Sequence, residues 1–334
     1  MNVPAKENGA EAGMVAGLVS VILPNRNHGH YIHKALDAFL AQSRPALEII
    51  VVDDASSDSS KDIVADYMRR DPRIRLIALA EHHGINQAVQ VGFAQAKGEY
   101  LHIAGADDFV EPKFFEDCVA ELILNPKAAL CFSDPSEFYR ESDQAILYPL
   151  YLSGKPIYFA PADLITQFAR NFFHISANTA VYRAAYFRAA GGYRAELEWF
   201  SDWFVTLIAA LRGGACYTPK QLTYVTIRGD SYSAVGLRNI RQKRELVQRI
   251  MGLLDAPQYT DVLPAMREAA MLPDYHVRTL FWLLRSRSGR AYVTPRLIRR
   301  VVGRYAWSFL RPLSPPRLRR ALRQASSSRM SAWR

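Results

Sequence analysis

The stretch VSVILPNRNHGHYIHKALDAFLAQSRPALEIIVVDDASSD (residues 19–58) contains the pattern that decides the fold. It opens within an apolar run, Leu18–Leu23, which has the length of a strand and which Pro24 follows. Apolar residues then recur at helical spacing through Tyr31–Gln42, and a second apolar run, Leu47–Val52, ends in two aspartates. Short runs rich in β-branched residues are typical of strands buried on both faces of a parallel sheet. The stretch therefore predicts a strand, a helix and a second strand.

The same alternation continues along the chain. A helix is predicted after Ser59, which can cap it. A strand is predicted over Arg73–Leu79, a helix over Asn86–Ala96 and a strand over Tyr100–Ala104. Strands and helices in this order predict a doubly wound α/β sheet, whose ligands bind beyond the carboxyl ends of the strands.

Length and composition limit the class of protein. The chain has 334 residues, of which 49% are apolar, enough for one large domain or two ordinary ones. Its three cysteines, Cys118, Cys131 and Cys216, are far apart and form no CxxC motif, so we expect neither a disulfide framework nor a structural zinc site. No apolar run approaches the ~18 residues of a membrane-spanning helix. Residues 1–17, interpreted as a flexible segment, do not resemble a secretory signal, so we expect a cytoplasmic protein.

Acidic pairs follow two of the predicted strands. Asp53-Asp54 ends the second strand and Asp107-Asp108 follows the fourth, so four carboxylates converge on one edge of the sheet. Carboxylates are preferred ligands of Mg²⁺ and Mn²⁺, and one or two suffice when substrate phosphates complete the coordination. A single acidic pair is also a common turn or helix cap, but two pairs at one edge favour a metal site. Neither a GxGxxG nor a GxxxxGK[ST] motif occurs, so the usual signs of dinucleotide binding and P-loop chemistry are missing.

Three segments resemble the inverting glycosyltransferases of family 2, which have the GT-A fold. They are residues 19–58, HHGINQAVQVGFAQAKGEYLHIAGADDFVEP (82–112) and GGYRAELEWFSDWF (191–204). The resemblance covers about two thirds of the chain. It implies an α/β fold with a GT-A (Rossmann-like, nucleotide-diphospho-sugar transferase) domain over residues 18–235. A basic, helical extension is then expected over 236–334.

The resemblance also implies roles for individual residues. The nucleotide sugar is expected at Pro24, Asn27, Asp53, Asp54, Asp107 and Arg228, a metal at Asp107 and Asp108, the acceptor near Gly191, Gly192 and Trp203, and the general base at Asp202. Two positions depart from the family pattern: Gly105 stands first in the DxD motif, and Val89-Gln90 stands where many relatives have Arg-Asn. No QxxRW-like signature follows, which indicates transfer of a single sugar.

The implied reaction moves a sugar from a nucleotide-diphosphate sugar, most readily a UDP-sugar, to a hydroxyl of a glycan or lipid-linked glycan. Mg²⁺ or Mn²⁺ would neutralise the leaving diphosphate, and Asp202 would take the proton of the attacking hydroxyl. Asp202 is also well placed for an ordinary helix cap. Two rival functions stay open: a sugar nucleotidyltransferase, although the glycine-rich loop it normally has is missing, and an inactive nucleotide- or glycan-binding module, which Gly105 makes plausible.

The C-terminal part is strongly basic. The chain has a net charge of +10, and the segment from Arg278 onward contains 15 arginines and no acidic residue. Apolar residues recur at helical spacing over Pro295–Leu310, which predicts an amphipathic helix. We expect residues 278–334 to dock on an anionic membrane at its cytoplasmic face, with a merely solvated basic tail as the alternative. No nucleic acid partner is expected.

Histidines and one arginine complete the candidates. His102 alternates with apolar neighbours on a predicted strand, so we expect an interior, hydrogen-bonded side chain. His28, His30 and His33 do not have the spacing of a zinc pair on a helix. Arg228 lies where relatives often place a loop that closes on the diphosphate, and a surface loop arginine is an equal alternative.

Overall fold

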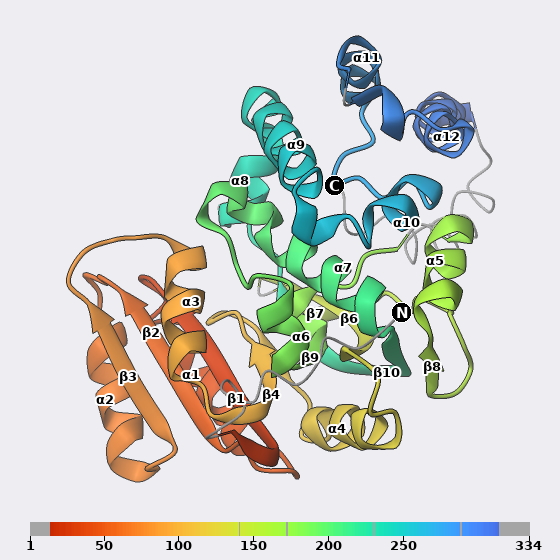
Figure 1. Cartoon of the computed structure of the whole chain (residues 1–334). Helices are drawn as coiled ribbons and strands as arrows, with labels where there is room; N and C mark the ends of the chain where they lie inside the picture. The colour runs from red at the N-terminus through yellow and green to blue at the C-terminus, as the bar shows by residue number, and fades with distance from the viewer. Residues whose placement is uncertain (1–13, 140, 172, 230, 288, 314–334) are drawn as a thin grey trace.

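A ten-stranded mixed sheet is the centre of the computed structural model, within the part of the chain that the structure describes (Figure 1). The described residues are 14–139, 141–171, 173–229, 231–287 and 289–313. The strand order is β3-β2-β1-β4-β9-β6-β10-β5, with β7 paired to β6 and β8 paired to β10. The expected α/β class is confirmed.

The first half of the chain alternates strands and helices as predicted. Its elements are β1 (Val15–Asn25), α1 (Ile32–Leu40), β2 (Glu48–Asp54), α2 (Ser60–Arg70), β3 (Ile74–Leu79), α3 (Ile85–Gln95) and β4 (Gly98–Ile103). β1 is parallel to both β2 and β4. It begins at Val15, before the predicted start, and continues through Pro24. Beyond Ile22 the strand pairs only with β2, so a residue without an N–H is tolerated there.

Burial explains why these segments form these elements. All seven residues of β2 are buried, as expected for a strand covered on both faces. In α1 the buried residues Ile32, Ala35, Leu36 and Phe39 lie on one face. The cap of α2 differs from the prediction: Ser59 makes no side-chain capping bond, and Asp58 Oδ1 accepts instead from Ser60 N at 3.0 Å. Asp58 also accepts from Gly29 N, so its position joins two loops.

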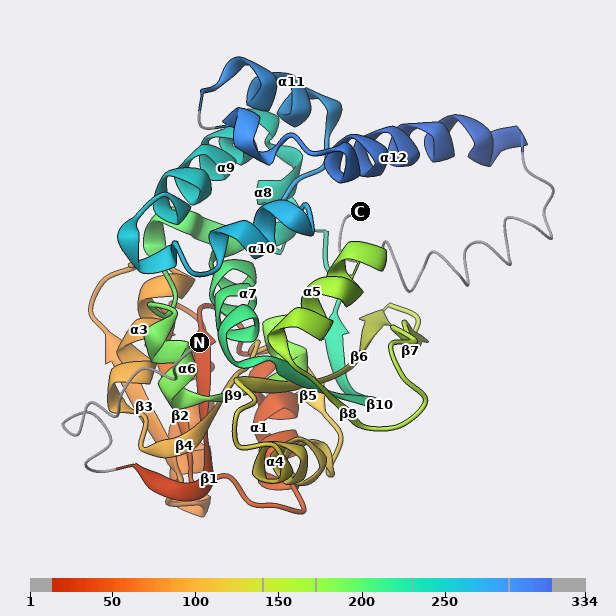
Figure 2. The same ribbon diagram turned by 45° about the vertical axis from the view of Figure 1, so that its right-hand side comes forward.

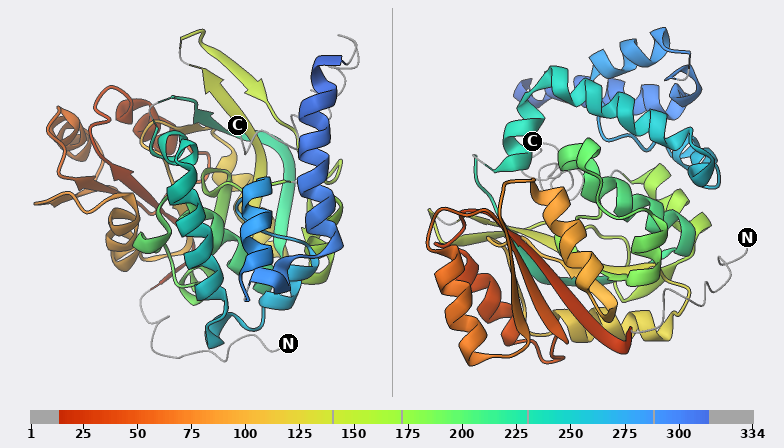
Figure 3. Two further views of the ribbon diagram at one scale, coloured as in Figure 1. Left: turned by 90° about the horizontal axis from the view of Figure 1, so that it is seen from above. Right: turned by 60° about the vertical axis from the view of Figure 1, so that its left-hand side comes forward.

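The middle of the chain completes the sheet. Its elements are β5 (Phe109–Val110), α4 (Phe114–Leu124), β6 (Leu130–Tyr139), β7 (Gln144–Leu147), β8 (Ile157–Phe159), α5 (Pro161–Arg170), η1 (Ala177–Thr179), β9 (Ala180–Arg183), α6 (Ala184–Ala189), η2 (Ala195–Phe200), α7 (Ser201–Gly213) and β10 (Ala215–Thr226). β9 is antiparallel to β4 and β6 and joins the two halves of the sheet. The yellow-green β6–β7 hairpin extends past the neighbouring strands (Figure 3).

Helices cover both faces of the sheet. Helices α1, α2 and α4 pack on one face, and α3, α5, α6 and α7 pack on the other (Figure 2). Cys118, Cys131 and Cys216, far apart in the sequence, lie together as free thiols in the core beneath α4. His102 is buried, as expected, and its Nδ1 lies 3.0 Å from the Ala180 carbonyl. Burial lowers the pKa of His102 to about 4.

The C-terminal part is helical, as expected. It comprises α8 (Tyr232–Arg238), α9 (Ile240–Leu254), η3 (Pro257–Tyr259), α10 (Leu263–Glu268), α11 (Val277–Arg285), η4 (Gly289–Tyr292) and α12 (Pro295–Leu313). Leu246, Met266 and Leu297 belong to the same hydrophobic core as Phe204 of α7, so these helices pack directly on the sheet domain (Figures 1 and 2). None of the described helices is long and apolar enough to cross a membrane. The expectations for residues 1–13 and 314–334 lie outside the described residues.

Candidate active site

A polar network joins the carboxyl ends of β1 and β2. Asp53 is 1% exposed, and its two carboxylate oxygens accept from Asn25 Nδ2 at 2.8 Å and from Ser56 N at 2.9 Å. Asn25 is buried as well, and its Oδ1 has no hydrogen-bond partner among the described residues. A buried acceptor without a partner costs free energy unless a ligand or water donates to it. Asn25 Oδ1 therefore calls for a donor from a water molecule or a ligand at this edge of the sheet.

Asn27 ties the loop after β1 to the loop after β2. Its φ is +54°, a left-handed conformation that asparagine tolerates better than most residues. Its backbone N–H donates to Ser56 Oγ at 2.9 Å, and its Oδ1 accepts from Ser57 N at 2.8 Å. Pro24 is buried just before this turn, at the end of β1. Pro24, Asn27 and Asp53 thus lie at one strand edge.

Asp54 contacts a different loop. Its carboxylate accepts from His83 N at 2.7 Å and Gly84 N at 2.8 Å, and it lies 2.6 Å from His82 Nδ1. Burial pushes the pKa of Asp54 upward, but these hydrogen bonds outweigh burial and hold its pKa below the usual value. Asp54 therefore holds the loop that leads into α3.

Asp107 and Asp108 follow β4 and differ in their surroundings. Asp108 Oδ1 accepts from Thr226 N at 2.8 Å, and Oδ2 accepts from Asn178 Nδ2 at 2.9 Å. Burial and then the neighbouring charge of Asp107 raise the pKa of Asp108 to about 7. A Cβ on Gly105 would meet Asp108 Oδ2 at 2.5 Å, so the Asp108 carboxylate occupies the space beside that position. The carboxylate of Asp107 is half-buried. The sequence did not predict that Asn178 and Thr226 hold Asp108 in place.

Arg228 lies beside Asp107. The distance from Arg228 Nε to Asp107 Oδ2 is 3.6 Å, and the guanidinium lies 5.0 Å from the centre of the Tyr31 ring. Thr226, two residues earlier, donates its hydroxyl to the Asp107 carbonyl, which brings the end of β10 to the acidic pair. Three loops, after β1, β4 and β10, therefore meet at this point.

The donor atoms around Asp107 suit one kind of cation site. In the ranges that the structure describes, no three His, Cys, Asp or Glu side chains gather into a group that could hold a metal. Mg²⁺ normally binds one or two protein carboxylates and completes its shell with water and substrate phosphates. Asp107, with Asp108 next to it, fits a cation held mainly by substrate and does not fit a cage of protein ligands.

Asp202 lies in the first turn of α7. Its Oδ1 accepts from Trp203 N at 2.6 Å, and the side chain is half-buried. Burial raises the pKa of Asp202 to about 6, although the backbone hydrogen bonds oppose that rise. Trp203 is 9% exposed and is part of the core. A carboxylate at a helix N-terminus with a pKa near neutrality suits a group that must take up a proton.

Gly191 and Gly192 form a turn before α7 that no other residue type would adopt easily. Their φ values are +92° and +61°. A Cβ on Gly192 would lie 2.7 Å from Gln90 Oε1, and Gln90 Nε2 donates to the Tyr193 carbonyl at 2.6 Å. The departure from the family pattern at Gln90 therefore has a structural role. The contacts of Asn86 and Gln90 with the segment before α7 were not predicted. Their spacing of four positions, which places both on one face of α3, was the only sign of a shared role in the sequence.

Comparison with known proteins agrees with this geometry. The family model described as Glycosyl transferase family 2 matches residues 20–188. Glycosyltransferase GlyG of Streptococcus pneumoniae is 37% identical over 99 residues, 30% of this chain and 33% of that protein. The putative teichuronic acid biosynthesis glycosyltransferase TuaG of Bacillus subtilis is 38% identical over 91 residues, 27% and 36% of the two chains. The chain thus matches about a third of the length of these curated relatives.

Solved structures have the same fold at low identity. S. aureus TarS 1–349 in complex with UDP-GlcNAc has a TM-score of 0.57 at 18% identity, covering 82% of this chain and 89% of that one. Mannosyltransferase PcManGT from Pyrobaculum calidifontis, in complex with GDP-Man and Mn²⁺, has a TM-score of 0.52 at 18% identity, covering 92% and 84%. The expected GT-A fold is confirmed. Since the family model matches half of its residues, the chain belongs to glycosyl transferase family 2.

Proposed function

We propose that this protein is an inverting glycosyltransferase that moves one sugar from a nucleotide-diphosphate sugar to a hydroxyl of a glycan or lipid-linked glycan. The observation that supports it best is the pairing of Asp107 with Arg228 at the carboxyl edge of the sheet. Among the structural neighbours, TarS is seen with UDP-GlcNAc or UDP and PcManGT with GDP-Man. A UDP-sugar is our first choice of donor.

The loops after β1 and β2 would bind the nucleotide. Asn25 Oδ1 is a buried acceptor without a hydrogen-bond donor among the described residues, and an N–H of the base or a ribose hydroxyl would donate to it. Asn27 and Asp53 lie in the same network, and Asp54 would act by holding the adjacent loop.

Arg228 would contact the diphosphate. Its guanidinium already lies beside a carboxylate, and a charge-assisted hydrogen bond to a phosphate oxygen is a strong alternative to that ion pair. Negative charge grows on the diphosphate as its bond to the anomeric carbon breaks, so a fixed cation there lowers the barrier. Asp107, with Asp108 nearby, would hold Mg²⁺ or Mn²⁺, which would neutralise the same leaving group.

Asp202 would accept the proton of the attacking hydroxyl. Its pKa of about 6 leaves the carboxylate ionised at neutral pH and close enough to neutrality to take a proton in the transition state. Attack from the face opposite the diphosphate inverts the anomeric carbon. The acceptor would lie near Gly191, Gly192 and Trp203. Trp203 directly follows Asp202, and the two glycines begin the segment that leads to it.

A thermal-shift panel of UDP-, GDP- and dTDP-sugars with Mn²⁺ tests the donor. A ligand that binds only the native state stabilises it, by about 2.7 kcal/mol at a concentration 100 times its Kd. We expect one nucleotide class to raise the melting temperature, with loss of that shift in Asp107→Ala or with chelator. No shift with any nucleotide sugar would refute the proposal.

Activity assays distinguish the two rival functions from the proposed one. A sugar nucleotidyltransferase would release diphosphate from a nucleoside triphosphate and a sugar phosphate. An inactive binding module would bind the nucleotide sugar without hydrolysing it. Transfer or slow hydrolysis of the donor that Asp202→Asn abolishes would exclude both.

We also propose that the C-terminal helices dock on an anionic membrane, at its cytoplasmic face. Phe281 is 59% exposed and Leu284 47% exposed on α11, and Ile298 and Val302 are exposed on α12. Exposed apolar side chains on amphipathic helices rich in arginine are typical of helices that lie in a membrane interface. Such a surface would bring the enzyme to a lipid-linked acceptor.

A further inference from the structure

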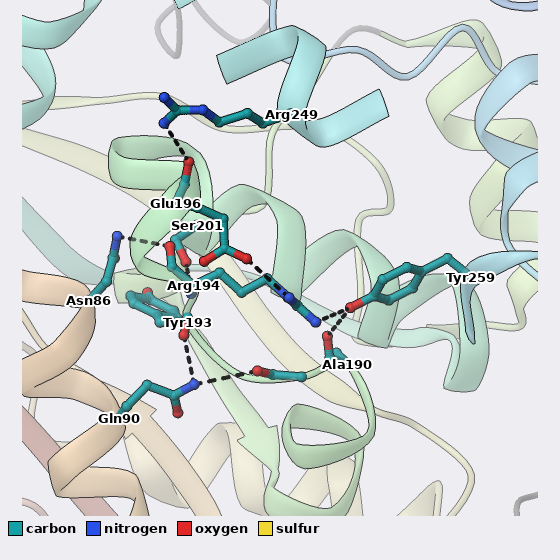
Figure 4. Close-up of polar contacts among 10 residues, drawn as sticks. Asn86, Gln90, Ala190, Tyr193, Arg194, Glu196, Ser201, Arg249 and Tyr259 are labelled. Atoms are coloured by element: carbon teal, nitrogen blue, oxygen red, sulfur yellow. Dashed lines mark hydrogen bonds and ion pairs between the residues drawn. The ribbon is translucent and has the colours of Figure 1, made fainter. Parts of the chain in front are cut away.

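The segment between α6 and α7 is held in shape by side chains from elsewhere in the molecule. It includes both glycines and leads directly to Asp202. Side chains of other elements donate to the backbone carbonyls of Ala190, Tyr193, Arg194 and Glu196 (Figure 4). The carbonyls of Gly191 and Glu198 accept side-chain hydrogen bonds in the same way. Side chains from other elements thus satisfy backbone groups of this segment and help to fix its path.

Helix α3 supplies the contacts on one side. Asn86 Nδ2 donates to the carbonyls of Arg194 at 3.1 Å and Glu198 at 2.9 Å. Gln90 Nε2 donates to the carbonyl of Tyr193 at 2.6 Å. The two amides are one helical turn apart, so they lie on the same face of α3.

The C-terminal helices supply the contacts on the other side. The Tyr259 hydroxyl donates to the Ala190 carbonyl at 3.2 Å and accepts from Arg194 Nη2 at 3.0 Å. Tyr259 is 1% exposed, and its ring packs edge-on against Phe204 of α7. Arg249 of α9 donates through Nη1 to the Glu196 carbonyl at 3.2 Å. Residues from the extension thus contact the segment at its first residue, Ala190, and again at Glu196.

Glu198 has a backbone conformation that needs such support. Its φ is +47°, which non-glycine residues rarely adopt. Its carboxylate accepts from Gln242 Nε2 and lies 3.8 Å from Arg249 Nη1, both on α9. Arg194 N donates to Ser201 Oγ at 2.5 Å, which links the segment to the residue before Asp202.

We infer that Tyr259 and Arg249, both in the C-terminal extension, are positioning residues for the general base and the acceptor-side glycines. They reach no reacting group and act through the backbone of residues 190–200. What the segment does in catalysis rests on the proposed function, but the contacts themselves do not. The extension is then part of the catalytic unit as well as a docking element.

Hydrogen exchange tests the contacts without any assay of activity. Tyr259→Phe keeps the ring and removes the hydroxyl, so amides of residues 190–201 should exchange several-fold faster by mass spectrometry. Tyr275→Phe is the matched control, because that hydroxyl donates to the Ala270 carbonyl at 2.7 Å in the same extension but not to the segment. Unchanged exchange in Tyr259→Phe, or an equal increase in the control, would overturn the inference.

Donor hydrolysis tests the catalytic consequence, with the nucleotide sugar that the thermal-shift panel selects. We expect Tyr259→Phe and Arg249→Gln to lower kcat by about 10- to 100-fold and to leave the donor KM unchanged. The control is Arg241→Gln, on the exposed face of α9, the helix that also contains Arg249. This variant should leave kcat and the donor KM unchanged. An unaltered kcat in the two test variants would overturn the positioning role. If the wild type hydrolyses no donor, the proposed function fails, and hydrogen exchange still decides whether Tyr259 holds the segment.

Discussion

Asp202 combines a position at a helix N-terminus with burial that raises its pKa to about 6. Because a general base acts only when ionised, kcat/KM should rise with pH through about 6 and level off above it. Asp202→Asn should lower kcat by about 10²- to 10⁴-fold, remove that inflection and leave the donor Kd unchanged. A pH series of donor turnover, with calorimetry for the Kd, provides the measurement. A variant that keeps the inflection would assign the base elsewhere.

Gly105 stands where the family has the first aspartate of DxD, and the structure explains why an aspartate cannot simply be restored. An added Cβ would meet the Asp108 carboxylate at 2.5 Å, and a third charge would join the pair. We predict that Gly105→Asp lowers the melting temperature and does not tighten Mn²⁺ binding. Gly105→Ala separates the steric cost from the charge. Tighter Mn²⁺ binding by titration calorimetry would contradict the prediction.

Residue type and spacing in the sequence were enough to predict charged site residues such as Asp107 and Arg228. Asp107 and Arg228, 121 positions apart, lie side by side as a shared site requires. Asn86, Gln90 and Tyr259 escaped prediction because they contact backbone carbonyls, which are the same at every residue and leave no pattern. The roles of all the predicted site residues, such as Asp53 and Asp107 in binding the nucleotide sugar and Asp202 in catalysis, stay predictions.

At the scale of elements, the contact between α3 and the glycine turn gives a paired test. Gly192→Ala should destabilise the fold by about 1–2 kcal/mol or more, because φ is +61° and Gln90 fills the space. Gly252→Ala, at an exposed position of α9 with nothing within 4 Å of the added Cβ, should stabilise the fold by about 0.5–1 kcal/mol. Urea unfolding of both variants measures the difference. Equal changes in the free energy of unfolding would mean that Gln90 and the backbone conformation do not restrict the position of Gly192.

The elements up to β4 could be predicted because each apolar run is long and the period changes clearly between strand and helix. Beyond β4 four of the strands, β5, β7, β8 and β9, have four residues or fewer. The two long strands, β6 and β10, pair in parallel although they are far apart in the sequence. The order of all these strands depends on contacts between distant segments, such as β6 with β10. Local patterns do not contain that information.

At the scale of the whole molecule, the exposed apolar residues of α11 and α12 predict membrane binding. The wild type should sediment with phosphatidylglycerol vesicles but not with phosphatidylcholine vesicles, and less so as salt rises. Phe281→Ser with Leu284→Ser should weaken binding about tenfold or more. Leu124→Ser, equally apolar and 74% exposed but on α4, is the control. Equal binding by all three proteins would mean that Phe281 and Leu284 are not part of the docking surface, and no sedimentation with either vesicle would leave the basic tail merely solvated.

The hydrogen bond from Tyr259 to the Ala190 carbonyl has a practical consequence for anyone who shortens or recombines this protein. A fragment cut at residue 235 would retain every motif of the family yet lose Gln242, Arg249 and Tyr259. In such a fragment the part from β1 to β4 should fold, but the proposed transfer of a sugar should be lost. Chimaeras that exchange C-terminal helices between relatives should join after residue 259, so that residues 190–200 keep their contacts with Gln242, Arg249 and Tyr259.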